Sequence, residues 1–497
     1  MDNPGESIDA SATARTLHER LRQIRRDVAA EARHSLSTWQ PALHRPGFLP
    51  SAENLARYLA LRRDDLRDLQ DALVPLGLSS LGRCEAHVAA SLDAVSAALA
   101  AIAGLPAEPF PAPDALTQGA SRLAHRSREL FGPRATGPRS RIMATLPSEA
   151  ATDPALVARI LAAGADVLRI NSAHDGPDAW AAMIANARAV TPEGRSVKIA
   201  MDLAGPKVRI LALDTDKKVR LYRGDRFVLA SQFGAPDTIP TATLSHPEMI
   251  AQLSPGARVW IDDGKIGARV VALGVGRAEL EVTVAAAKGA RLKPEKGVNL
   301  PGVDVDIPAL TEADLRALDF AAEHADLIGF SFVQTPADIR SLIAALAARR
   351  GERQLPPLLL KIETQKAVRN LPRLIVEAGG TLPVAVMIAR GDLAVEIGLE
   401  RLSEMQEEIL WICEAAQVPV VWATQVLDTL LKDGSASRAE ATDAAMAQRA
   451  ECVMLNKGPF LPEAVEFLGR ILSRLDRHQA KKFPRLGPLH SWDDAAG

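Results

Sequence analysis

Charged residues stand where short apolar runs of this 497-residue chain end. Lys361 and Glu363 lie two apart in LLLKIET, so both side chains point to one face of an extended strand. Asp392 follows the next apolar run, in ARGD. Adjacent parallel strands lie about 4.8 Å apart, so Glu363 and Asp392 can share one Mg²⁺ (or Mn²⁺), leaving most of its shell to water and substrate oxygens. Taken singly, these residues are better explained by an internal ion pair and a turn cap, and only their combination favours a metal site.

Other strand ends carry groups that bind anions or move protons. Arg169 in LRINSAHDG suits a bidentate grip on phosphate or carboxylate, and a salt bridge to a strand-end acid is its alternative. Gly391 lets an anion approach the backbone. Thr424 in WATQ can relay a proton, or bond a local carbonyl instead. The remaining polar strand ends are Asn171, Asp202 and Ser331. With no nucleophile in the set, phosphoryl transfer or enolate chemistry fits better than acyl transfer.

The elements that must position these residues follow a repeating pattern from residue 139 onward. Eight apolar runs alternate with helical patterns, which predicts an α/β fold, a (β/α)8 TIM barrel. The predicted strands are 141–146, 167–171, 198–203, 327–332, 358–363, 384–389, 418–423 and 452–456. In such a barrel the active site lies at the carboxyl ends of the strands, where the polar residues above stand.

Three further segments complete the predicted organisation. Residues 206–300 alternate apolar and polar residues, which predicts an inserted small β-barrel lid domain. Residues 1–138 predict an all-α N-terminal extension, with helices in 51–78 and 83–105 and a proline-rich linker after them. The barrel is expected to comprise 139–205 and 301–475, and 476–497 form a C-terminal tail.

Composition excludes several classes of protein. The formal net charge is −2, so nothing marks the chain as a nucleic-acid binder. The three cysteines lie far apart without metal-binding spacing, which favours a reducing, cytoplasmic setting. We see no secretory signal and no apolar run long enough to span a bilayer, so we expect no membrane partner. There is no P-loop and no dinucleotide fingerprint.

Seven ordered motifs resemble the pyruvate kinase family: DLAGPKVR, IDDGKI, KGVNLPG, KIETQKAV, ARGDLAVEI, WATQVLDTL and SRAEATDAA. The resemblance covers roughly residues 139–475 and implies phosphoryl transfer between phosphoenolpyruvate and ADP, giving pyruvate and ATP. It implies that Lys361 stabilises the transferring phosphoryl group, that Arg169 grips it, that Glu363 and Asp392 bind Mg²⁺, and that Thr424 lies near the carbon that takes up a proton. Substrate-side positions are also implied at Ala389, Gly391 and Ser331, and nucleotide-side positions at His174, Arg209 and Lys296.

The chain departs from the family pattern at the monovalent-cation region. Asn171 and Asp202 remain, but Ala173 and Leu203 replace hydroxyl residues. Lys207 stands where potassium-dependent members have glutamate, and its ammonium can supply the charge of a bound ion. We therefore expect that K⁺ is not required.

Two other readings remain open. The altered turns TLPSEA and LNKGPF leave room for an Mg²⁺-dependent enolate enzyme, a lyase or another phosphotransferase, on the same barrel. A catalytically weak regulatory homologue, whose N-terminal helices bind a partner, is the second alternative. The family's C-terminal domain, with its activator site, is expected to be absent, which leaves homo-oligomer formation open.

Overall fold

The computed structural model describes residues 9–134, 137–234, 238–303, 307–481 and 483–484. Eight parallel strands form a closed barrel, in which each of the eight predicted runs supplies one strand. The strands are β1 (Arg141–Thr145), β2 (Val167–Asn171), β3 (Lys198–Asp202), β13 (Leu327–Phe330), β14 (Leu358–Ile362), β15 (Val384–Ala389), β16 (Val420–Ala423) and β17 (Cys452–Leu455). The predicted TIM barrel is confirmed.

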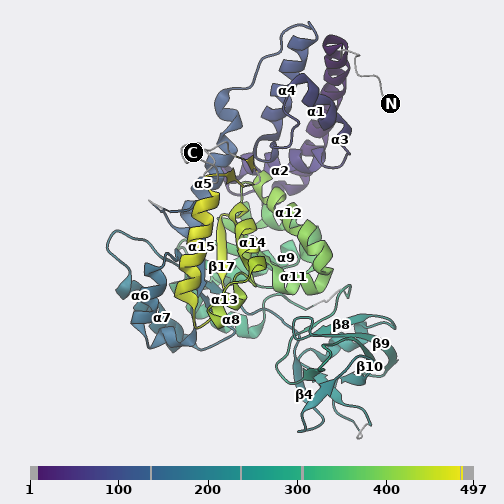
Figure 1. Cartoon of the computed structure of the whole chain (residues 1–497), viewed down its shortest axis with the longest axis vertical. Coiled ribbons are helices and arrows are strands. Elements are labelled where there is room, and N and C mark those ends of the chain that lie inside the picture. The colour runs from purple at the N-terminus through teal and green to yellow at the C-terminus, as the bar shows by residue number, and fades with distance from the viewer. Residues whose placement is uncertain (1–8, 135–136, 235–237, 304–306, 482, 485–497) are drawn as a thin grey trace, which may run out of the picture.

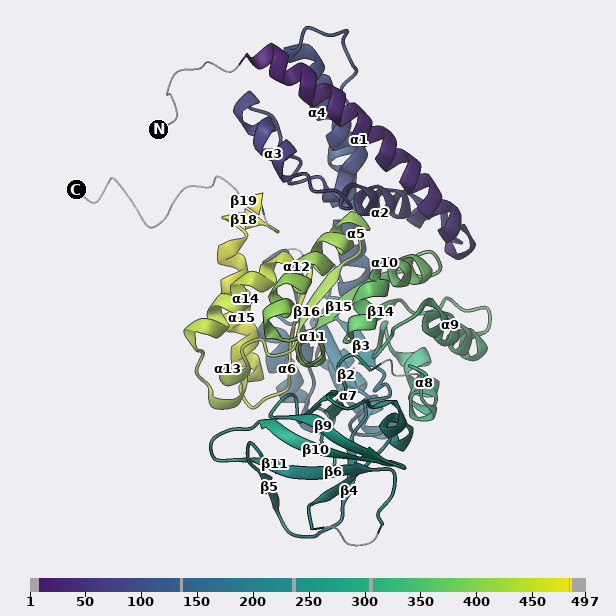
Figure 2. The same ribbon diagram turned by 90° about the vertical axis from the view of Figure 1, so that its right-hand side faces the viewer.

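Helices surround the barrel, as Figure 2 shows. They are α6 (Pro154–Ala162), α7 (Pro177–Val190), α8 (Glu312–His324), α9 (Pro336–Arg350), α10 (Gln365–Gly379), α11 (Arg390–Ile397), α12 (Leu399–Ala415), α13 (Asp428–Asp433), α14 (Arg438–Met446) and α15 (Leu461–Leu475). Side-chain caps define where several of them begin. Thr311, Thr335 and Ser437 each form a reciprocal capping box with an acidic residue three positions later.

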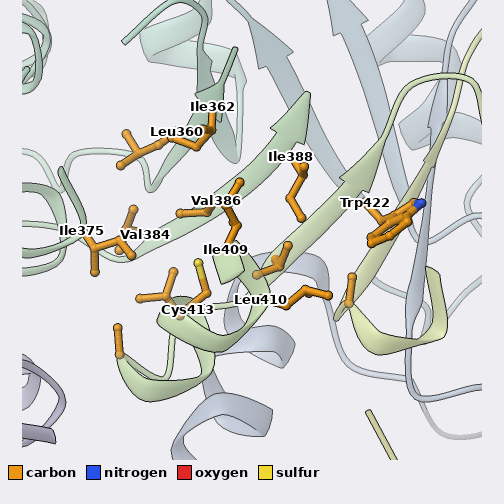
Figure 3. Packing of buried hydrophobic residues seen from close by; sticks show 14 of the residues in the cluster. Leu360, Ile362, Ile375, Val384, Val386, Ile388, Ile409, Leu410, Cys413 and Trp422 are labelled. Atoms are coloured by element: carbon orange, nitrogen blue, oxygen red, sulfur yellow. The ribbon is translucent and has the colours of Figure 1, made fainter. Parts of the chain in front are cut away.

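The period of two along each strand separates an outer core from an inner one. Leu360 and Val386 point outward and pack with Ile409 of α12 (Figure 3). Leu359 and Ala385, one position earlier on the same strands, belong to a separate inner cluster. Side chains two positions further along an inner row must therefore also face the barrel axis, which carries them toward the mouth.

The inserted lid is a sheet of seven strands in the order β12-β8-β9-β10-β6-β7-β4, with a short β5–β11 pair beside it. Its strands are β4 (Ile210–Leu213), β5 (Val219–Leu221), β6 (Arg226–Ala230), β7 (Thr241–Leu244), β8 (Arg258–Ile261), β9 (Ile266–Gly274), β10 (Arg277–Val284), β11 (Ala290–Leu292) and β12 (Val298–Asn299). It has its own hydrophobic core, and Figures 1 and 2 place it at one end of the barrel, with the N-terminal helices at the other.

The N-terminal region is helical, as predicted: α1 (Ala10–Trp39), α2 (Leu49–Leu61), α3 (Arg67–Leu73), α4 (Val88–Ile102) and α5 (Gln118–Phe131). The stretch expected to form one helix over 51–78 is divided into α2 and α3. Asp65 Oδ1 accepts a hydrogen bond from the Arg67 backbone N–H at 3.1 Å, a local turn between the two helices, directly before α3 begins.

The N-terminal helices share a hydrophobic core with the barrel. The end of α5 closes the bottom of the barrel, because Leu130 and Phe131 are fully buried in the inner cluster beside Met143 and Val167. Phe48 packs against Gly379 of α10, where an added Cβ would lie 2.6 Å from the phenyl ring. The helices and the barrel therefore form one packed unit.

Gln417, in the turn between α12 and β16, connects the two parts by hydrogen bonds. Its side chain is 1% exposed, accepts from Ser51 Oγ at 2.6 Å and donates to the Ala86 carbonyl at 3.1 Å. The Arg126 guanidinium donates to the Gln417 carbonyl at 2.9 Å. Every polar group of this buried side chain is thus paired with the N-terminal helices.

One apolar helical stretch corrects an expectation from the sequence. Among the described residues, Glu85–Ile102 has the length and composition to cross a membrane, and 56% of it is buried within the protein. A core helix of a soluble protein meets the same criterion, and α4 packs here against α1 and α2. The expectation that no apolar run is long enough to span a bilayer was therefore wrong, judged by length and composition alone.

The three cysteines and the tail complete the fold. Cys84, Cys413 and Cys452 are buried and form no disulfide in the described part of the chain. The short strands β18 (Gln479–Ala480) and β19 (Phe483–Pro484) pair after α15, and the Lys481 ammonium lies 2.7 Å from Glu451 Oε1. Residues 482 and 485–497 of the predicted tail lie outside the described residues.

Candidate active site

The inner rows of four neighbouring strands bring the predicted polar residues to one mouth. The rows end in Arg169 and Asn171 on β2, Asp202 on β3, Ser331 just after β13, Lys361 on β14 and Glu363 just after it. The register pairs Asn171 with Asp202, and Asp202 with Gly329, two positions before Ser331. Period-two alternation and barrel closure together produce this cluster.

Lys361 lies at the centre of the cluster. Its Nζ donates to Ser331 Oγ at 2.7 Å and lies 3.0 Å from Glu363 Oε1 and 3.6 Å from Asp202 Oδ2. Burial alone would lower the pKa of Lys361, but the carboxylates of Glu363 and Asp202 outweigh it, and the pKa is raised above 10.5. The side chain therefore stays cationic at neutral pH, as a phosphoryl-stabilising group must be.

Arg169 makes the contact that the sequence offered as its alternative role. Its Nε and Nη2 lie 2.9 and 2.8 Å from Asp202 Oδ2, and its Nη1 donates to Thr145 Oγ1 at 3.0 Å. Asp202 is fully buried, and burial would raise its pKa, but Arg169 and Lys361 lower it below 3.8. Gly329 is required beside it, since an added Cβ would lie 2.1 Å from Asp202 Oδ1.

Glu363 and Asp392 have the donor atoms that Mg²⁺ prefers. Glu363 is 2% exposed, and its Oε2 accepts from the Phe332 backbone N–H at 2.5 Å. Burial and the neighbouring Asp392 charge raise the pKa of Glu363 above 4.5, although Lys361 opposes this. Glu363 is buried and Asp392 is half-buried, and they lie near enough for the charge of Asp392 to raise the pKa of Glu363. Two neighbouring carboxylates of this kind can hold a divalent cation.

Lys207 reaches from the lid junction to Asp392, the second of these carboxylates. Its Nζ lies 2.7 Å from Asp392 Oδ1 and 3.7 Å from Asp263 Oδ1. Burial would lower the pKa of Lys207, but Asp392 and Asp263 raise it above 10.5. The ammonium thus lies on the Asp392 side of the mouth, whereas Asn171 turns its Oδ1 to the Ala173 backbone N–H at 3.2 Å.

The side chains around that amide offer few cation ligands. Ala173 and Leu203 carry no oxygen, and Leu203 is 1% exposed. Asp202 Oδ1 is buried without a hydrogen-bond partner in the described part of the chain. Asp202 and Asn171 therefore supply the side-chain oxygens in the monovalent-cation region identified from the sequence.

Thr424 meets the first turn of α11. Its Oγ1 accepts a hydrogen bond from the Gly391 backbone N–H at 2.7 Å, and the buried Ala389 ends β15 directly before that turn. Because the oxygen already accepts from an amide, the hydroxyl hydrogen remains available to another acceptor.

A cavity of about 390 Å³ opens beside Arg169 and Asn171. It is bordered by His174 and by the two altered turns, which contribute Thr145, Leu146, Asn456 and Lys457. Burial, followed by the positive charge of Lys457, lowers the pKa of His174 below 6.5. The cavity therefore combines a neutral imidazole with cationic groups, which suits a phosphate-bearing ligand.

Sequence reasoning missed several residues of this cavity: Thr145, Asp175, Asp263, Gln425, Asp428, Lys432, Asn456 and Lys457. The rule that strand ends carry the site could have found Thr145, Asn456 and Lys457, since they end β1 and follow β17. The other two predicted nucleotide residues make contacts within the lid. Arg209 Nη1 donates to the Glu295 carbonyl at 2.9 Å, and Lys296 Nζ lies 2.7 Å from Asp262 Oδ1.

Comparison with known proteins gives consistent matches. A family model described as pyruvate kinase, barrel domain, matches residues 137–460. A pyruvate kinase of Agrobacterium vitis is 36% identical over 351 residues, which are 69% of this chain and 70% of the relative. One of Methylorubrum extorquens is 35% identical over 347 residues, 68% of this chain and 69% of the relative. Pyruvate kinase 1 of Trypanosoma brucei brucei is 33% identical over 364 residues, 71% and 70% of the two chains.

Proposed function

The chain belongs to the pyruvate kinase family, and we propose that it transfers a phosphoryl group between phosphoenolpyruvate and ADP, giving pyruvate and ATP. The observation that supports this most is the cluster of Lys361, Arg169 and Glu363 at one barrel mouth. Phosphoryl transfer needs positioning and charge stabilisation rather than a protein nucleophile, and the mouth supplies both.

Glu363 and Asp392 are the proposed ligands of Mg²⁺ or Mn²⁺. When bound, the ion neutralises charge on the phosphoryl and enolate oxygens. The buried Lys361 ammonium acts from the other side, where its raised pKa keeps it charged throughout. Arg169, held in orientation by Asp202 and Thr145, presents its planar guanidinium to the phosphoryl oxygens.

Thr424 is the proposed proton relay to the enolate carbon. Its Oγ1 accepts from Gly391 N–H, so its own hydrogen can point toward the substrate. Ala389, Gly391 and Ser331 are proposed to border the substrate. The α11 N-terminus there favours the substrate carboxylate, because helix N-termini attract anions.

ADP is proposed to occupy the cavity between His174 and Lys457, with Arg209 and Lys296 approaching from the lid. The positive charge near His174 supports this placement, as does the position of the lid at this end of the barrel. Lid closure would then exclude water from the transferring group.

We also propose that the reaction does not require K⁺. Two of the side chains in the cation region lack oxygen, and the half-buried Lys207 ammonium lies 2.7 Å from Asp392 Oδ1. Replacing K⁺ by tetramethylammonium should leave the Mg²⁺-dependent rate unchanged, and Lys207→Met should lower it more than Lys207→Arg. A many-fold stimulation of the wild-type protein by K⁺ would contradict this proposal.

Pyruvate formation by the purified full-length chain with phosphoenolpyruvate, ADP and Mg²⁺ tests the main proposal. We expect turnover that Asp392→Asn abolishes. Pyruvate made without ADP, or phosphoenolpyruvate consumed for another product, would favour an enolate lyase or a different phosphotransferase. Binding of phosphoenolpyruvate without any turnover would favour a catalytically weak homologue that acts through a partner of its N-terminal helices. Gel filtration coupled to light scattering would establish whether the chain forms a homo-oligomer.

A further inference from the structure

Thr424 has a backbone conformation that threonine rarely adopts. Its φ is +64°, in the left-handed region, and Gln425 follows with φ +55°. A β-branched side chain is crowded in this region, so surrounding contacts must hold it there. The groups that fix Thr424 therefore also fix the direction of its hydroxyl.

The guanidinium of Arg390 binds the two peptide groups that flank Thr424. Its Nε donates to the Ala423 carbonyl at 2.9 Å, and its Nη2 donates to the Thr424 carbonyl at 2.6 Å. The planes of these two peptides define φ and ψ of Thr424. One rigid guanidinium thus holds both dihedral angles.

Arg390 is itself fixed from behind. Asp443 of α14 binds it through two contacts, 2.5 Å to Nη1 and 2.8 Å to Nη2, and the guanidinium lies 4.7 Å from the centre of the Trp422 ring. The residue is 8% exposed. It is not one of the described residues that border the cavity beside Arg169.

We propose that Arg390 and Asp443 are a positioning pair for the reaction, which hold Thr424 Oγ1 against the Gly391 N–H and direct its hydroxyl to the carbon that takes up the proton. This inference rests on the proposed function, in which Thr424 relays that proton. Arg390 directly precedes Gly391, so the same residue also places the amide donor of this hydrogen bond. Lysine cannot replace the Arg390 guanidinium, because one ammonium cannot bind two carbonyls and a carboxylate that lie in one plane.

The test compares Arg390→Lys and Asp443→Asn with Thr424→Val, which removes the hydroxyl itself. Exchange of the pyruvate methyl protons with D₂O, in the presence of Mg²⁺ and ATP, reports proton transfer alone and is followed by proton NMR. We expect both positioning variants to lower exchange and kcat at least about tenfold, with little change in the KM for phosphoenolpyruvate. Arg340→Lys, at an exposed ion pair with Glu377, is the matched control and should have no effect.

A double variant separates positioning from general damage. Asp443→Asn should add little to the loss caused by Thr424→Val, because both act through one hydroxyl. Losses that multiply, or unchanged exchange in Asp443→Asn, would overturn the inference. A crystal structure of Asp443→Asn tests the inference independently of any activity measurement. We expect the backbone of Thr424 to leave the left-handed region, and an unchanged φ at Thr424 would overturn the proposed positioning by Arg390 and Asp443. Absence of turnover in the wild-type protein would instead refute the proposed function.

Discussion

Replacing Gln417 by alanine tests whether the N-terminal helices are an integral part of the barrel. The side chain is 1% exposed and makes two hydrogen bonds across the interface, with Ser51 and Ala86. Its removal leaves the Ser51 hydroxyl and the Ala86 carbonyl buried without that partner. Each such group costs about 1–3 kcal/mol, so we expect the free energy of unfolding to fall by about 2–6 kcal/mol. This is a large part of the usual stability of a domain, about 5–15 kcal/mol.

Urea unfolding followed by circular dichroism measures this loss. Gln23→Ala is the matched control, because Gln23 is exposed on α1 and bonds Asp27 and Arg26 of the same helix. We expect the control to stay within about 0.5 kcal/mol of the wild type. A Gln417→Ala protein as stable as this control would refute the reasoning. So would a variant whose N-terminal helices unfold in a separate transition while the barrel unfolds at the same urea midpoint as in the wild type.

Three further predictions concern pH, the mouth and the barrel floor. Burial, together with the charge of Asp392, raises the pKa of Glu396 from 4.5 to about 7. Between these two pH values the folded protein keeps the proton on Glu396, whereas the unfolded chain has lost it. The free energy of unfolding therefore falls as pH rises from about 4.5 to 7, by about 3 kcal/mol in total. Glu396→Gln removes this slope, and the melting temperatures of the two proteins between pH 4.5 and 8, without Mg²⁺, check it; parallel curves would contradict it. Gly329→Ala places a Cβ 2.1 Å from Asp202 Oδ1, so we expect a loss of about 1–3 kcal/mol and a higher KM for phosphoenolpyruvate, and steady-state kinetics identical to the wild type would count against it. Phe131→Ala leaves a cavity at the bottom of the barrel and should lower the free energy of unfolding by about 3–5 kcal/mol, measured by the shift of the urea midpoint. A shift no larger than that of a surface substitution would contradict the role of Phe131 in closing the barrel.

The sequence predicted the barrel well because its pattern is local. Each strand of the barrel is a short apolar run, and alternation along β14 and the residue after it directs Lys361 and Glu363 to one face. The inserted lid could be predicted equally well, since apolar and polar residues alternate along its strands. The division of α2 from α3 was missed, because the Asp65 turn interrupts a leucine spacing that otherwise continues.

Contacts between distant segments were beyond the sequence. The pairing of Arg169 with Asp202 depends on the register of β2 and β3, and the binding of Arg390 by Asp443 depends on barrel closure. The position of Lys207 against Asp392 depends on how the lid joins the barrel. Spacing fixes which residues share a face, whereas distances between them follow from tertiary packing.

The fate of the phosphorus atom tests the central proposal most directly. Phosphorus NMR of phosphoenolpyruvate, ADP and Mg²⁺ with the wild-type protein follows it through the reaction. With the wild-type protein, we expect the phosphoenolpyruvate resonance to disappear as the resonance of the ATP γ-phosphate grows in equal amount. With Lys361→Met, which lacks the central ammonium, we expect the spectrum to stay constant over time. Phosphorus recovered only as inorganic phosphate, or ATP formed equally well by Lys361→Met, would contradict the proposed transfer at this mouth.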